Sequence, residues 1–180
     1  KGAGSLHIGE PTAKLELAVA VEAPSAKFTS DLTLTGEALT LDEIQGKALG
    51  TDFTGTVTIN ALASRPTAKG TVWFERLDLS SSESGTAPQT VPIPAEIQIS
   101  AGVVALPNLT LEGVRAKLVA DGNNIVVDQI QANVAGGQLS GKISKSGVGA
   151  EMQLASALRG NRIHLAQLPA LAAIHDEVQG

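Results

Sequence analysis

Residues 136–143 read GGQLSGKI, and residues 50–57, which lie 86 positions earlier, read GTDFTGTV. Both stretches have glycine at their first and sixth positions. The later one also follows the GxxxxGK[ST] spacing of a phosphate-binding loop up to its last position, where Ile143 replaces Ser or Thr. The earlier copy lacks the lysine, and the residues after Gly141 continue as strand and turn, not helix. We therefore predict that these glycines form a turn with positive φ and a close backbone approach inside a strand.

The 86-residue spacing extends well beyond the glycines. Apolar residues keep their phase between the two stretches, and turn-like residues coincide. We interpret residues 26–79 and 112–165 as two copies of one unit. Identical pairs include Leu32 with Leu118, Asp42 with Asp128, Ile44 with Ile130, Gln45 with Gln131 and Arg76 with Arg162.

Apolar and polar residues alternate through most of the chain, as is typical of half-buried strands. Residues 80–92 are rich in Ser, Pro and Gly and are predicted to be a loop or linker. Residues 166–179 space their apolar side chains three or four apart, which predicts one amphipathic helix. We expect residues 1–180 to form a single all-β domain: a curved, groove-like antiparallel sheet of two related repeats with one C-terminal helix.

The composition limits the kinds of partner. Hydrophobic residues make up 43 % of the chain but aromatics only 2 %, so the core is aliphatic and offers no ring platform for stacking sugars or bases. The net charge is −5 and no basic cluster is present, which argues against nucleic acid. There is no cysteine. The chain starts at Lys1 without a signal peptide or membrane span, and we interpret it as part of a longer protein whose membrane anchor lies outside this sequence.

Residues that could carry chemistry are sparse. None of the three histidines has a second ligand at metal-binding spacing, and no serine or cysteine nucleophile motif occurs. Asp42 and Asp128 recur at equivalent positions, where a hydrogen bond at a strand end explains both. We predict no catalytic, cofactor-binding or metal-binding residue, and a protein that is not an enzyme.

What remains is apolar surface. The aliphatic stripes of the predicted strands either fill a closed sandwich core or line an open groove that binds lipid tails or another apolar strand. Composition leaves both alternatives open. The candidate groove residues are Leu15, Leu17, Val19, Leu32, Leu34, Val57, Ile59, Ile97, Ile99, Ile125, Val127, Leu139 and Ile143.

Residues 49–81 resemble the recurring unit of AsmA-like proteins. Their small-Gly-x-x-aromatic-x-Gly strand leads to an Arg-Pro turn at Arg65 and then to a strand ending in Leu-Asp-Leu. Residues 109–144 resemble later strands of that family, and residues 158–171 resemble its strand-to-helix exit. The second copy lacks the Arg-Pro turn and the aspartate. TamB-type proteins, built from related β repeats, are similar as well.

The resemblance implies a periplasmic segment of a protein anchored in the inner membrane of a Gram-negative bacterium. Such proteins form long apolar β-grooves for phospholipid transport or outer-membrane assembly, without cofactor or catalytic residues. Phospholipid or other apolar chains, and other envelope proteins, are the partners that the resemblance implies. A closed β-sandwich scaffold or protein-interaction module of the envelope is the alternative.

Overall fold

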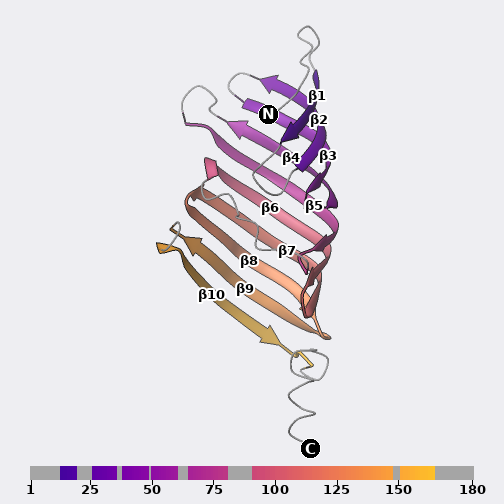
Figure 1. Ribbon diagram of the computed structural model, residues 1–180, viewed down its shortest axis with the longest axis vertical. Helices are drawn as coiled ribbons and strands as arrows, with labels where there is room; N and C mark the ends of the chain where they lie inside the picture. The colour runs from indigo at the N-terminus through magenta and orange to yellow at the C-terminus, as the bar shows by residue number, and fades with distance from the viewer. Residues whose placement is uncertain are drawn as a thin grey trace, which may run out of the picture.

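The computed structural model describes residues 13–19, 26–35, 38–48, 50–60, 65–80, 91–147 and 151–164, without the side chains of 13–19, 26, 27, 91 and 92. These residues form one open sheet of ten strands, ordered in space as they are in the chain (Figure 1). The all-β prediction is confirmed. The strands are β1 (Ala13–Val19), β2 (Ala26–Thr35), β3 (Ala38–Ala48), β4 (Thr51–Asn60), β5 (Thr67–Asp78), β6 (Val91–Leu106), β7 (Leu109–Gly122), β8 (Asn124–Val134), β9 (Gly137–Ser146) and β10 (Gln153–Asn161).

The sheet is mostly antiparallel, with one exception that the sequence did not predict. β5 and β6 pair in parallel, with Val72 opposite Ile99. A parallel pair needs a connection of about a dozen residues or more, and the chain between Asp78 and Val91 has that length. The predicted loop at 80–92 was also too long, because Val91 and Pro92 belong to β6. Its residues 81–90, and the predicted helix at 166–179, lie outside the described residues.

The paired glycines behave as the sequence predicts. Gly50 and Gly136 both have φ of +74° in the turns that precede β4 and β9. Gly55 and Gly141 lie inside those strands, where an added Cβ would overlap the carbonyl oxygens of neighbouring strands. The stretch with phosphate-loop spacing is therefore a turn followed by a strand.

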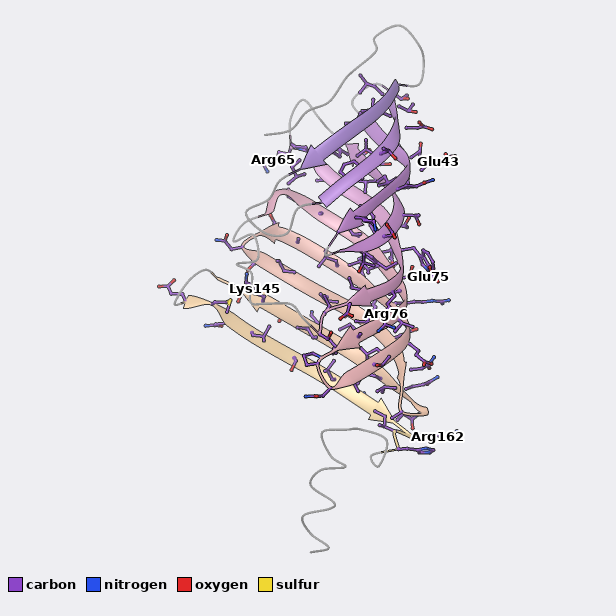
Figure 2. The ribbon with its side chains drawn as sticks, turned by 45° about the vertical axis from the view of Figure 1, so that its right-hand side comes forward. Glu43, Arg65, Glu75, Arg76, Lys145 and Arg162 are labelled. Atoms are coloured by element: carbon purple, nitrogen blue, oxygen red, sulfur yellow. The ribbon has the colours of Figure 1, made fainter. Side chains whose placement is uncertain are left out.

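The strands bend near one end. Figure 2 shows Glu43 and Glu75 one below the other along this bent side, pointing away from the sheet. Glu43 lies at a register shift between β3 and β4 and has φ of +51°, which is uncommon for a residue with a side chain. Such bulges bend a strand and increase its twist. The bend therefore follows from irregularities in the ladder.

The buried hydrophobic cluster lies on the central strands. Its members come from β6, β7 and β8, and partly buried side chains from β5, β9 and the strand ends pack around them. No second sheet is present in the described part of the chain. The sequence analysis kept a closed sandwich as an alternative, and the described residues do not form one. The buried members are Ala101, Val104, Leu111, Ala132 and Val134.

Strands 86 residues apart have corresponding geometry. β8 and β9 cover the residues that lie 86 positions after β3 and β4. The bulge after Leu41 in β3 recurs after Val127 in β8, and the residue at the bulge has φ of +51° or +53°. Across the hairpins, Phe53 faces Phe74 as Leu139 faces Gly160.

Candidate apolar binding face

One row of mostly aliphatic residues crosses all ten strands on one face of the sheet. Paired residues of neighbouring strands share a face, so the ladder can be followed from strand to strand. We call this the apolar face. Ten strands at the usual spacing give the row a length of roughly 43 Å. From β1 to β10 it contains Ala13, Leu32, Leu41, Val57, Gly70, Ile97, Leu118, Val127, Ile143 and Ser156.

The other candidates from the sequence fall in rows on the same face. Leu34, Ile59 and Ile125 belong to the next row along the strands. Ile99 and Leu139 also lie on the apolar face, in rows that are nearer the bend than the long row is. Leu15 and Leu17 occupy register positions opposite Ser30 and Phe28, and Val19 is opposite Ala26. The side chains of these three β1 residues lie outside the described part.

Parts of the apolar face are open to solvent. Leu34 is 62 % exposed, and Leu154 and Leu158 on β10 are 72 % and 48 % exposed. In contrast, Ile44 and Ile130, which follow the two bulges, are only 4 % and 7 % exposed. The face is therefore well covered beside the bend and uncovered toward β2 and β10. The exposed aliphatic side chains therefore lie toward both ends of the sheet, on β2 and on β10.

Small residues interrupt the aliphatic rows. Gly70 lies between Val57 and Ile97 in the long row, and Ala95 and Ala120 face each other in the next. Gly55 and Gly141 pair with Ile44 and Ile130. At these places the apolar face lacks a side chain beyond Cβ. The apolar face thus combines protruding Leu, Ile and Val side chains with shallow depressions at the Gly and Ala positions.

The opposite face, which we call the polar face, carries hydroxyls, amides and charges. Lys117 on β7 forms an ion pair with Glu96 on β6 at 2.9 Å. This hydrogen bond from Lys117 holds the pKa of the Glu96 carboxyl below its usual value. Lys47 and Asp52 form a second pair across the turn between β3 and β4.

Sequence reasoning missed one residue of the polar face. Composition suggested that the core offers no ring for stacking, and that expectation did not extend to the surface, where Trp73 on β5 is 47 % exposed. β-strand alternation puts Trp73 on the opposite side of the strand from its neighbours Val72 and Phe74. The alternation of β5 was the available signal. Trp73 borders two hollows, of about 1030 and 430 Å³.

The described residues do not bring the other candidate chemical groups together into a site. Asp42 and Asp128 lie on β3 and β8, five strand spacings apart, which is about 24 Å. The Asp128 carboxylate instead accepts a hydrogen bond from the Gln129 backbone N–H at 2.7 Å. Within the described ranges, no group of three or more potential ligands could hold a metal ion. In the same residues no helix is long and apolar enough to cross a bilayer.

Comparison with protein-family models, with curated proteins and with solved structures gave no match for this chain. The class that the geometry defines is an open, single-layered, all-β sheet with one apolar and one polar face.

Proposed function

We propose that the apolar face binds the acyl chains of phospholipid and that this chain is a non-enzymatic segment of a lipid-handling, AsmA-like envelope protein. The observation that carries the proposal is the aliphatic row across ten strands, together with Leu34, Leu154 and Leu158, which are exposed in neighbouring rows of the same face. The row's length of roughly 43 Å exceeds the about 30 Å of a bilayer's hydrocarbon core. An acyl chain lying along the rows would stay in apolar contact throughout.

The chemistry of the face suits aliphatic chains. Leu, Ile and Val side chains present methyl groups, while Gly70, Ala95 and Ala120 leave low positions between them. Each methylene removed from water contributes about 0.8 kcal/mol, so a chain gains affinity with length and needs no specific polar contact. Such binding allows a lipid to slide along the face.

The cellular setting follows from the resemblance. We place the chain in the periplasm of a Gram-negative bacterium, within a parent protein anchored in the inner membrane. Its work would be phospholipid transport toward the outer membrane or support of outer-membrane assembly, beside other envelope proteins. The bend of the strands would shape the apolar face into a groove.

We also infer that residues 26–79 and 112–165 are copies of one unit. The corresponding bulges, turn glycines and cross-strand partners support this inference. Adding units in the same sheet lengthens the apolar row without changing its width. A longer groove can therefore be built from repeats alone.

Lipid extraction tests the proposal. The purified chain, produced in a Gram-negative host, is extracted with organic solvent and its phospholipid is measured by mass spectrometry. We expect bound phospholipid in the unchanged protein, and little in Val57→Asp, Val127→Asp or Leu158→Asp. Val119→Asp is the matched control, because Val119 is exposed on the polar face and should retain lipid.

The outcomes separate the alternatives. Far-UV circular dichroism establishes that each variant is folded before lipid is compared, and Leu158 is exposed enough to accept a charge. Absence of phospholipid from the unchanged protein would contradict the proposal, as would equal lipid in the Leu158→Asp variant and the control.

A protein-interaction module remains the second candidate, favoured by one observation. β10 is the last strand of the described sheet, and all of its residues are exposed. An open edge of this kind can pair with a strand from another protein. A partner that binds this edge would protect the β10 amides from hydrogen exchange and leave the apolar row unchanged.

A further inference from the structure

The polar face carries a second row that the lipid function does not use. It runs through six adjacent strands, from Trp73 on β5 to Arg159 on β10, with each residue directly opposite the next. Its six members are an indole, two guanidinium groups, an amide and two hydroxyls. They are Trp73, Ser100, Arg115, Gln131, Ser140 and Arg159.

All six of these residues border one hollow of about 1030 Å³. A parallel row of amides, Asn133, Gln138 and Asn161, lines the same hollow. Where Gly102 and Gly113 line it, the hollow meets backbone without a side chain. The hollow therefore presents one ring and many hydrogen-bonding groups over a long, open surface.

The two arginines are available to a ligand. Arg115 and Arg159 are exposed, and neither forms an ion pair in the described part of the protein. They lie three strand spacings apart, about 14 Å, and Trp73 lies about 10 Å from Arg115 by the same measure. Guanidinium groups recognise carboxylate or phosphate with paired hydrogen bonds. The hollow thus fits a ligand with acidic groups at intervals.

We propose that this hollow binds an acidic oligosaccharide. The C–H face of one sugar ring would stack on the exposed indole of Trp73, which has an apolar body and can use its N–H as a donor. The amides and hydroxyls would bond sugar hydroxyl groups, and Arg115 and Arg159 would bind acidic substituents. Such a ligand would use the ring, the row of amides and the spaced cations together.

A nearby carboxylate sharpens the proposal. Glu112 on β7 faces Asn133, in the row next to Arg115, and it is exposed. It would repel an acidic sugar at the edge of the hollow. Glu112→Gln should therefore tighten binding of an acidic ligand and leave a neutral one unaffected.

Trp73 makes the test direct. It is the single tryptophan of a chain that has no tyrosine, so intrinsic fluorescence reports this site alone. Titration of the full chain with tetragalacturonate should give a saturable change in emission, and maltotetraose should bind at least about tenfold more weakly, as expected when charge-assisted hydrogen bonds are lost.

Variants then assign the contacts. Arg115→Gln and Arg159→Gln should each weaken tetragalacturonate binding by about tenfold. Trp73→Ala should abolish binding by calorimetry. Arg76→Gln is the matched control, because Arg76 is an exposed arginine of β5 that does not line the hollow, and it should bind normally.

Three results would overturn the proposal. One is the absence of a saturable signal with tetragalacturonate. Another is equal weakening by Arg76→Gln and Arg115→Gln, which would indicate general charge attraction. The third is tighter binding of single-stranded oligo(dT), which would assign the hollow to nucleic acid. Because Trp73, Arg115 and Arg159 are on the polar face, phospholipid content should stay unchanged in their variants.

Discussion

Strands β2–β5 and β7–β10 pair in corresponding registers, but different side chains fill the two ladders. At the bend, β4 and β5 bring Phe53 and Phe74 together with ring centroids 5.8 Å apart. The corresponding place in β9 and β10 holds Leu139 and Gly160, and Ile163 packs over this glycine. The comparison teaches that two ladders can share the same backbone pattern of bulges and turn glycines while different side chains fill the space at the bend.

The inner glycines give the largest expected effect. Gly141→Val should cost about 3 kcal/mol or more, because the new side chain would overlap Ala157 O and because φ of +153° strains a β-branched residue. Gly55→Val overlaps Thr71 O without that strain, so its cost should be smaller. Urea unfolding measures both. A difference in the opposite direction would contradict the assigned backbone geometry.

The two isoleucines that follow the bulges should behave alike. Ile44 and Ile130 are both buried and occupy corresponding positions, so Ile44→Ala and Ile130→Ala should each lower the free energy of unfolding by about 2–4 kcal/mol. Thr58→Ala, at a half-buried position on the polar face of β4, is a control that should cost much less. If one isoleucine substitution were nearly neutral, the two ladders would not be equivalent.

The cost of substituting Gly160 in β10 should depend on the side chain of Ile163, which packs over it. An added Cβ at Gly160 would lie 2.6 Å from Ile163 Cδ1, the end of a flexible side chain. Gly160→Ala should therefore cost about 1 kcal/mol alone and less in an Ile163→Ala background. A double-mutant cycle measures this coupling. Strict additivity would show that Ile163 does not cover Gly160 in solution.

The smallest effect concerns an ion pair between β6 and β7. Lys117 pairs with Glu96 on β6, whereas Asp31 takes the corresponding position on β2. Since Lys117 lowers the pKa of Glu96 in the folded state, the pair stabilises the protein above the usual carboxylate pKa of 4.5 and is lost as pH falls through the folded value. Glu96→Gln should lower Tm slightly at pH 7 and have no effect at pH 2. An effect that persists at pH 2 would contradict this cause.

Much of the fold was predictable from local pattern. Alternation predicted the strands, and the recurring glycines predicted the turns at Gly50 and Gly136 and the close contacts at Gly55 and Gly141. The parallel pairing of β5 and β6 was not predictable, because alternation is the same in either direction and only the length of the connection bears on it. The extent of β6 was missed because Pro92 and Pro94 look like loop residues.

The candidate face was partly predictable. Each stripe was visible in the sequence, but no pattern within one strand tells how its register meets the next. Leu32, Val57 and Val127 fall into one row only through the pairing of all the strands between them. The polar row was missed for the same reason, since Trp73 and Arg159 are distant in sequence and belong together only across six strands.

Photo-crosslinking with a phosphatidylglycerol that carries a diazirine at the end of one acyl chain tests the central claim most directly. Peptide mapping by mass spectrometry identifies the labelled residues. Binding to the apolar face predicts labels at Leu34, Ile97 and Leu158, with Trp73 and Val119 unlabelled although both are exposed and apolar. Labels on Trp73 or Val119, or no labelling of the apolar face, would contradict the account.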